Sequence, residues 1–342
     1  MEAILQNRTK HFSMKKVLVL GGTQFVGRVL VEELLKRGGY EVVLFNRGKT
    51  NAQLFPELRK IHGNRETDDL FQTCSEDWDA VIDISGYYPN TLQAFASRIQ
   101  PYCKRYIFIS TASVYNLEIS ENKLIGEDFD LLPCTTEQRT DNTMATYGQR
   151  KVACEEALLQ CEGLDAIILR PSVIYGPYDP FDRHYYWLYR VKNRKQILFP
   201  ETGQTSKDSF TFVNDLANII ITSIDLPQHN KVYNVNTHPL TNLFETVNTM
   251  AAAVNTQPNF SMASTEFLDK EKVQVWTDLP LWMNGSFLMM DNSRLLADFP
   301  PILTPLQDSF TQTAAYYEQL EWPKPKTGIS LEDEADLIDL MK

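Results

Sequence analysis

The fold is decided by residues 17–28, which read VLVLGGTQFVGR. Four apolar residues that suit a buried strand precede a glycine pair, and an amphipathic segment over residues 28–37 follows at once. Such a strand–turn–helix unit brings backbone N–H groups and the positive end of a helix dipole to one point, where phosphate binds well. The stretch predicts a dinucleotide-binding turn. The alternative is an ordinary strand–turn–helix corner.

The same alternation continues through the first half of the chain and is typical of a parallel sheet covered by helices. Strands are expected at residues 17–20, 41–45, 80–84, 106–110 and 166–170, and helices at residues 28–37, 91–99 and 147–161. These elements predict an α/β fold, a Rossmann-type doubly wound parallel sheet that binds its ligand at the carboxyl ends of the strands.

The composition changes after Pro177, where aromatic and basic residues crowd residues 178–194. We expect an N-terminal extension over residues 1–13, a dinucleotide-binding domain over 14–176, a smaller, mainly substrate-binding portion over 177–330, and an acidic tail over 331–342. Residues 208–221 and 231–236 are expected to be a helix and a strand that return to the sheet. Residues 331–340, which carry five acidic residues and no basic one, are expected to form a solvated helix.

Charge and composition argue against several classes of function. The formal net charge of −11 opposes nonspecific binding to nucleic acid. No apolar run reaches the roughly 18 residues that cross a bilayer, and residues 1–13 do not resemble a signal peptide. The five cysteines include no CxxC pair, so we expect no metal site, no disulfide framework and a cytoplasmic location.

Four motifs carry a resemblance to one family: GGTQFVGR at 21–28, DAVIDISG at 79–86, LRPSVIYGP at 169–177 and FTFVNDLA at 210–217. Their order is similar to that in atypical extended short-chain dehydrogenase/reductases, a family that includes sugar-nucleotide epimerases and dehydratases. The resemblance implies an NAD(P)-dependent enzyme, although Gln24 replaces the usual central glycine of the loop. It also implies the cofactor-binding residues, which are Gly21, Thr23, Gln24, Phe25 and Val26 in the loop, Ile84, Ser85 and Gly86 after the third expected strand, and Pro171 and Val173 beside the nicotinamide.

The end of the second strand favours NADP over NAD. A site for NAD usually has an acidic residue here that binds the ribose 2′-hydroxyl, but this chain has Asn46, followed by Arg47 and Lys49. A guanidinium can bind the 2′-phosphate in a bidentate manner, with Lys49 as a supporting charge. In the alternative interpretation both bases are solvated and Asn46 meets the ribose of NAD.

Tyr147 is the one tyrosine of the chain that is followed four residues later by lysine, Lys151. On a helix the two side chains share a face, so the ammonium and an oxidised nicotinamide would lower the phenol pKa toward neutrality, as a general base requires. The resemblance places this pair at the family's YxxxK and assigns Thr111 to the substrate oxygen. The alternative is a solvated pair on a helix surface.

Substrate contacts are expected at Ser113 and Tyr175, in segments that resemble the family, and at Arg183, in the aromatic and basic stretch over residues 178–194. Arg183, Arg190 or Lys192 would face an anion, unless residues 178–194 form a helix with its aromatic residues inward and its bases in water. Sugar-nucleotide enzymes usually keep an arginine just before the FxxVxD segment, but here Asp208 stands there beside Lys207. A carboxylate would repel a diphosphate.

These residues predict an oxidoreductase or epimerase/dehydratase that acts on a sugar-like or nucleotide-sugar metabolite by hydride transfer, with Tyr147 as general acid/base. Simple reduction, epimerisation and dehydration all remain open. The alternative is a non-catalytic regulatory or RNA-binding protein of the same fold. An apolar stripe over residues 151–161 suggests a homodimer, although the stripe would equally suit packing against the sheet.

Overall fold

The computed structural model describes residues 14–119, 123–285, 288–299 and 303–342, so the expected extension over residues 1–13 lies outside the described residues. Its centre is a seven-stranded sheet in the order β10-β6-β5-β4-β1-β2-β3, in which all neighbouring strands are parallel. The strands are β1 (Lys15–Leu20), β2 (Tyr40–Asn46), β3 (Arg59–His62), β4 (Ala80–Asp83), β5 (Tyr106–Ile109), β6 (Ala166–Pro171) and β10 (Lys231–Val235). The expected Rossmann-type sheet is confirmed.

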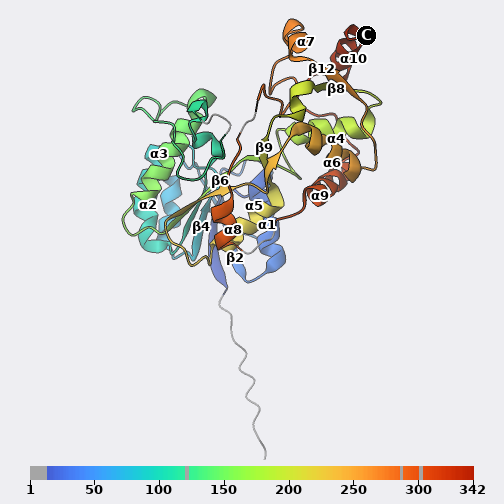
Figure 1. Cartoon of the computed structure of the whole chain (residues 1–342). Coiled ribbons are helices and arrows are strands. Elements are labelled where there is room, and N and C mark those ends of the chain that lie inside the picture. The colour runs from blue at the N-terminus through green and yellow to red at the C-terminus, as the bar shows by residue number, and fades with distance from the viewer. Residues whose placement is uncertain (1–13, 120–122, 286–287, 300–302) are drawn as a thin grey trace, which may run out of the picture.

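Helices cover both faces of this sheet (Figure 1), and its central strands are accordingly almost continuously apolar, whereas the edge strand β3 is polar and half-exposed. The helices α1 (Phe25–Arg37) and α5 (Val213–Ser223) pack together on one face, and α2 (Pro89–Ile99) and α3 (Tyr147–Leu159) pack together on the other. Within β1, Val17 and Val19 belong to the core under α1 and α5, whereas Leu18 and Leu20 belong to the core under α2 and α3.

The strand order reverses beside β1, because the chain runs from β1 to β2 and β3 on one side and then crosses to β4 on the other, so the ends of β1 and β4 flank a topological switch point, called the crevice below. Leu20 is the register partner of both Phe45 in β2 and Asp83 in β4, so these three strands end together at one edge. In open α/β sheets a ligand binds at such a switch point. The glycine turn after Leu20 therefore lies at this switch point, where the sequence motif predicts that a dinucleotide binds.

The second half of the chain forms a separate aromatic core beside the sheet, seen at the upper right of Figure 1. It contains α4 (Arg183–Asn193), α6 (Leu243–Ala253), α7 (Thr265–Lys270), α9 (Leu306–Gln319), α10 (Leu331–Leu340) and the parallel pair β8 (Ile197–Pro200) and β12 (Phe260–Ala263). A three-stranded sheet, β11-β9-β7, runs between the two cores, with β7 (Val173–Tyr175), β9 (Asp208–Phe212) and β11 (His238–Thr241). The short α8 (Ser293–Asp298) packs on β10.

Two expectations about elements need correction. Residues 208–221 are not one helix, because the buried residues Asp208–Phe212 pair with strands on both sides as β9 and the helix α5 begins only at Val213. The strand at 231–236 does return to the main sheet, as β10 beside β6. The acidic tail is a helix, as expected, but it is not solvated throughout, because Glu334 is fully buried.

The apolar stripe on α3 is buried within the single chain. Val152, Ala153, Ala157 and Leu158 all have exposed fractions below 7%. These residues therefore face the interior, as the alternative interpretation held, and do not supply a surface for a homodimer. Within the described part of the chain, every helix is too short or too polar to cross a bilayer.

Candidate functional site

The glycine turn is built for a close approach of its backbone. Gly21 and Gly22 have φ angles of 121° and 92°, in the region that favours glycine. A side chain at Gly27 would lie 2.8 Å from the Gly22 nitrogen, so α1 can approach the turn this closely only with glycine there. Gln24, the exposed residue before α1, makes no side-chain cap within the described residues, so its helix end presents N–H groups to the crevice.

The loop residues predicted for the cofactor differ in exposure. Thr23 and Val26 are buried, Phe25 is half-buried with a φ of 40°, and Gln24 is exposed. Asn51 Nδ2 donates to the Thr23 carbonyl at 2.8 Å, which ties the turn to the loop after β2. The turn is thus held from its side by backbone and amide contacts.

Asn46, at the end of β2, uses its side chain to hold backbone. Its Nδ2 donates to the Gly21 carbonyl at 3.3 Å, and its Oδ1 accepts from the Gly48 nitrogen at 2.9 Å. Arg47 and Lys49 are exposed beside it. The arrangement supports the loop and leaves two cationic side chains at its surface.

Lys151 lies on the first turns of α3, buried under the end of the sheet. Its ammonium donates to the carbonyl of Gly86 at 3.0 Å and to the carbonyl of Ile109 at 2.7 Å. It also lies 3.9 Å from the centre of the Phe108 ring. Burial, the largest cause, lowers the pKa of Lys151 to about 8. The lysine therefore ties the ends of β4 and β5 to α3.

Tyr147 lies at the start of α3, half-buried, with its ring 6.3 Å from the ring of Tyr87. Burial raises the pKa of Tyr147 to about 12, and the neighbouring Thr111 hydroxyl opposes that rise. This direction is opposite to the lowering expected from the sequence. The expected lowering included the charge of an oxidised nicotinamide, which the protein atoms do not supply.

Thr111 and Ser113 lie in the turn after β5. The Thr111 hydroxyl donates to Ser113 Oγ at 3.2 Å and accepts from the Ser113 nitrogen at 3.1 Å. The Thr111 hydroxyl also acts on the pKa of Tyr147, so Thr111 and Tyr147 lie near one another beside the end of β5. Ser85 and Gly86 follow β4 at the same edge, and Ile84 lies 3.9 Å from the position of a side chain at Gly21.

The residues predicted for the nicotinamide and substrate side are less uniform. Pro171 ends β6 and is buried, and Val173 begins β7 half-buried. Arg183 begins α4 half-buried, with its guanidinium over the rings of Phe181 and Trp276. Tyr175 is fully buried, and its hydroxyl is 2.5 Å from Ser309 Oγ, so it belongs to the second core and presents no free hydroxyl to the crevice.

The basic residues Arg190 and Lys192 were expected either to face an anionic substrate or to lie in water, and neither expectation describes both of them. Arg190 is buried and pairs with Glu334 of α10 at 3.2 Å, so it faces neither an anionic substrate nor water. Lys192 is exposed, with its ammonium 5.5 Å from the centre of the Trp322 ring. The aromatic residues from Tyr185 to Tyr189 are buried, as the packed-helix interpretation expected.

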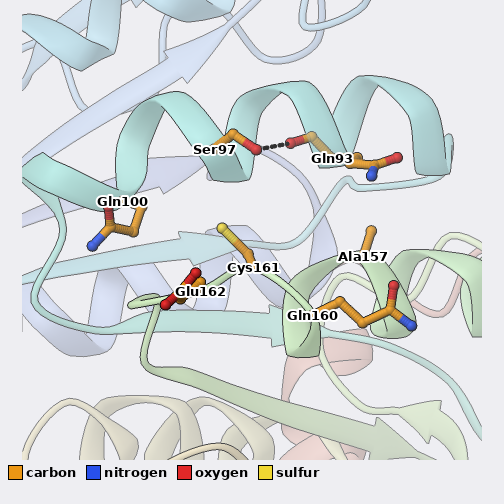
Figure 2. Close-up of a pocket in the computed structure, with 7 residues that line it drawn as sticks. All are labelled: Gln93, Ser97, Gln100, Ala157, Gln160, Cys161 and Glu162. Carbon is orange, nitrogen blue, oxygen red and sulfur yellow. Dashed lines mark hydrogen bonds between the residues drawn. The ribbon is translucent and has the colours of Figure 1, made fainter.

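A pocket of about 290 Å³ lies away from these residues, between the far ends of α2 and α3 (Figure 2). Figure 2 shows Gln93 and Ser97 of α2 facing Gln160 and Cys161 at the end of α3. Tyr147 is at the opposite end of α3, so this pocket is not the candidate site. The described residues contain no cluster of His, Cys, Asp and Glu that would hold a metal ion.

Sequence reasoning missed two residues at the crevice, Arg65 and Asp83. Arg65 follows β3, and its Nη1 lies 2.7 Å from Oδ1 of Asp83, the last residue of β4. A carboxylate at the end of an otherwise apolar strand was the available signal, since such a group is rarely buried without a partner. Its partner, 18 residues earlier, follows only from the strand order.

The chain is similar to known proteins over much of its length. The profile of the NAD dependent epimerase/dehydratase family matches residues 17–236. Chloroplast stem-loop binding protein of 41 kDa b from Arabidopsis thaliana is 29% identical over 56% of this chain and 50% of its own length. UDP-glucose 4-epimerase from Neisseria meningitidis serogroup C is 27% identical over 50% of this chain and 55% of its own length. The chain thus spans about half the length of these curated relatives.

The solved structure of the enzyme WbmH from Bordetella bronchiseptica, a complex with NAD+, shares the fold. Its TM-score is 0.66 at 21% identity, and the match covers 90% of this chain and 99% of that one. The shared architecture therefore includes the second core as well as the Rossmann sheet.

Proposed function

This chain belongs to the NAD-dependent epimerase/dehydratase family, and on that premise we propose that it is an NAD(P)-dependent enzyme acting on a nucleotide sugar or a related hydroxyl-bearing sugar. The observation that carries the proposal is the position of Lys151 on α3, where the carbonyls of Gly86 and Ile109 hold its ammonium and Tyr147 lies one helical turn before it. These groups lie at the edge of the sheet where the glycine turn meets α1. A proton-transfer group thus shares one crevice with a phosphate-binding helix end.

A nicotinamide dinucleotide, when bound, would supply the hydride chemistry at a substrate carbon, and the protein supplies binding and proton transfer. Thr111 holds the substrate oxygen that Tyr147 protonates or deprotonates. Without ligands the phenol of Tyr147 is neutral near pH 7 and carries the proton that a general acid donates, although burial raises its pKa and so makes it a weaker acid. To act as a base, Tyr147 needs added positive charge, which an oxidised nicotinamide carries.

Lys151 has a binding role in this proposal. An ammonium has three donors, and the carbonyls of Gly86 and Ile109 accept two hydrogen bonds from it. These two hydrogen bonds fix the direction of the third N–H of the ammonium, which we assign to a ribose hydroxyl of the dinucleotide. The two carbonyls fix the ammonium before the dinucleotide binds, which reduces the entropy lost on binding.

The substrate class follows from the relatives and is limited by Asp208. One relative is named for UDP-glucose, and we keep the half-buried Arg183, whose guanidinium lies over the rings of Phe181 and Trp276, as the candidate anion contact. Asp208, buried at the start of β9, stands where family members that bind diphosphates usually keep an arginine. The proposal therefore covers nucleotide sugars and simpler sugar-like substrates, and it keeps reduction, epimerisation and dehydration as alternatives.

The cofactor is a nicotinamide dinucleotide. WbmH was solved with NAD+, which favours NAD by analogy. The NADP preference rests on Arg47 and Lys49, both exposed at the end of β2, and stays a prediction. The cytoplasmic location and the homodimer also stay predictions, and the buried stripe on α3 no longer supports the latter.

The test of the enzyme proposal is Tyr147→Phe. The wild-type protein is mixed with NAD or NADP and UDP-glucose, and turnover is followed by absorbance at 340 nm and by chromatography of the sugar. Tyr147→Phe should retain dinucleotide affinity and lose about 10²–10⁴-fold in turnover, the usual contribution of general acid–base catalysis. Tyr102→Phe, on an exposed tyrosine before β5, is the matched control and should behave as the wild type. Equal turnover in Tyr147→Phe would move the catalytic role to another residue.

A second candidate function is RNA binding, favoured by the similarity to a chloroplast stem-loop binding protein. The net charge of −11 and the organised groups around Tyr147 favour the enzyme. A gel-shift titration with a stem-loop RNA at low salt separates the two. Tight RNA binding together with no affinity for either dinucleotide would replace the enzyme proposal.

A further inference from the structure

A buried ion pair lies beside Lys151 and has no part in the mechanism above. The guanidinium of Arg65 donates to both carboxylate oxygens of Asp83, at 2.7 and 3.0 Å. Asp83 is fully buried, and the Tyr106 hydroxyl also donates to it at 2.7 Å. A pair with this bidentate geometry is rigid, because both charges lose their partner if either side chain moves.

The ion pair holds the turn that follows β4. Arg65 Nη1 donates to Ser85 Oγ at 2.9 Å, and the Ser85 nitrogen donates to Asp83 Oδ1 at 3.1 Å. The Ser85 hydroxyl also donates to the carbonyl of Leu20 at 3.2 Å, and Leu20 immediately precedes the glycine turn. The pair is therefore hydrogen-bonded to the turn after β4, and through Ser85 to the end of β1.

Gly86 transmits this contact to Lys151. A side chain at Gly86 would lie 2.7 Å from the Phe108 ring and 3.0 Å from the Asp83 carboxylate, so its backbone is packed tightly between them. The Gly86 carbonyl accepts from the Lys151 ammonium. The position of this acceptor is consequently set by Asp83 and its partner.

The charges that act on Lys151 come from three elements. Asp83 at the end of β4 favours the ammonium, and Arg65 from the loop after β3 disfavours it. On α3 itself, Glu155 favours the ammonium but is bound to Arg170 at 2.6 Å, and burial raises the pKa of the Cys154 thiol to about 12, so that thiol is neutral where Lys151 titrates. The ring of Tyr87, from the loop after β4, lies 5.6 Å from the ammonium. Arg65 and Asp83 thus act on the lysine with opposite signs.

We propose that Arg65 and Asp83 are positioning residues for Lys151: the pair fixes the Gly86 carbonyl, and its two charges offset each other at the ammonium. This inference rests on the proposed function only for the use of Lys151 in catalysis. The position and charge state of Lys151 are properties of the protein alone.

The test measures the titration midpoint of Lys151 by NMR of protein labelled with ¹³C-lysine, with the signal assigned by its loss in Lys151→Met. Arg65→Gln leaves the Asp83 charge unbalanced, so the Lys151 midpoint should rise by about one pH unit. Asp83→Asn leaves the Arg65 charge unbalanced, so the midpoint should fall by about as much. Arg59→Gln is the control: it removes an exposed ion pair between β3 and Glu76, and it should not move the Lys151 midpoint.

General loosening of the turn would move the Lys151 midpoint in the same direction in both variants. Shifts in opposite directions would therefore come from the two charges. Equal midpoints in all variants, or shifts of the same sign, would overturn the inference. If Arg65→Gln does not fold, Arg65→Lys takes its place, and because it keeps the charge it should keep the wild-type Lys151 midpoint. The Asp83→Asn variant then decides: a lowered midpoint supports the inference, and an unchanged or raised midpoint overturns it.

The titration is independent of turnover. Opposite shifts in a protein that turns over no sugar would support the ion-pair inference and overturn the proposed function. Turnover that depends on Tyr147, together with an unchanged Lys151 midpoint in all variants, would support the proposed function and overturn the ion-pair inference. With active enzyme, the alkaline limb of the pH profile of kcat should shift in the same direction as each midpoint.

Discussion

At the scale of single residues, the side chains of the candidate site are held mainly by backbone groups and by ion pairs that lie behind them. Asn46 holds the glycine turn, and two carbonyls hold Lys151. Such contacts arise from segments far apart in the sequence. They explain why a Tyr–Lys spacing predicts the participants of the site but not the pKa values of the two groups.

The contrast between Tyr147 and Tyr175 shows the limit of sequence at this scale. Both belong to motifs that resemble family segments, but the Tyr175 side chain is buried in the second core, where its hydroxyl is hydrogen-bonded to Ser309. A motif fixes where the backbone passes, whereas the direction of a side chain depends on packing. Arg65 and Asp83 were missed for the same reason, since only the strand order brings them together.

Lys151 should make stability depend on pH. Its pKa is lowered to about 8 by burial, below the usual lysine value of about 10.4, so between these values the unfolded chain binds more protons. The wild type should therefore gain stability relative to Lys151→Met as pH rises, by up to about 1.4 kcal/mol per pH unit between pH 8 and 10, and lose it as pH falls through 8. Urea unfolding at pH 7, 8.5 and 10 measures this, and a constant difference between the proteins would contradict it.

Arg47 should decide the choice of dinucleotide if NADP is preferred. A hydrogen bond between an exposed guanidinium and a phosphate contributes at the low end of charge-assisted bonds, so Arg47→Ala should weaken NADP binding about tenfold and leave NAD unchanged. Calorimetric titration with both dinucleotides measures this, with Arg59→Ala as the control. Equal affinities of the wild type for NAD and NADP would remove the preference.

At the scale of elements, apolar strands were predictable and irregular ones were not. The five strands expected in the first half all exist, because each is buried on both faces and reads as a β-branched run. β3 was missed because the edge strand Arg59–His62 is half-exposed and polar. β9 was taken for helix because its aromatic residues join the helical pattern of α5 without a break.

The closeness of the glycine turn to α1 predicts a sharp effect at Gly27. Alanine there would place Cβ 2.8 Å from the Gly22 nitrogen, and because both are backbone positions the turn must shift. Gly27→Ala should lower the free energy of unfolding by about 1–3 kcal/mol, the usual cost of overpacking. Gly126→Ala is the control, since no described atom lies within 4 Å of the added carbon. Equal losses in the two variants would contradict the account.

At the scale of the whole molecule, the acidic tail is part of the second core. Glu334 of α10 pairs with buried Arg190 of α4 and accepts from the Leu198 nitrogen of β8 at 3.2 Å. The sequence showed a run of acidic residues, and only the packing of α10 on β8 separates Glu334 from its solvated neighbours.

Removal of this carboxylate should destabilise the second half. Glu334→Ala leaves Arg190 buried without its partner, which typically costs about 3–5 kcal/mol. Glu332→Ala, on an exposed residue of the same helix, should change stability by less than about 0.5 kcal/mol. Urea unfolding of both variants measures the difference, and matching midpoints would place the tail outside the core.

The central claim is that a nicotinamide dinucleotide binds where the glycine turn meets α1, at the edge of the sheet that carries Lys151. Calorimetric titration of the wild-type protein and Gly27→Ala with NAD and with NADP tests it most directly. The account predicts one binding site in the wild type for at least one dinucleotide, with affinity lost in folded Gly27→Ala and kept in Gly126→Ala. A wild-type protein that binds neither dinucleotide, or a Gly27→Ala variant that binds as tightly as the wild type, would contradict it.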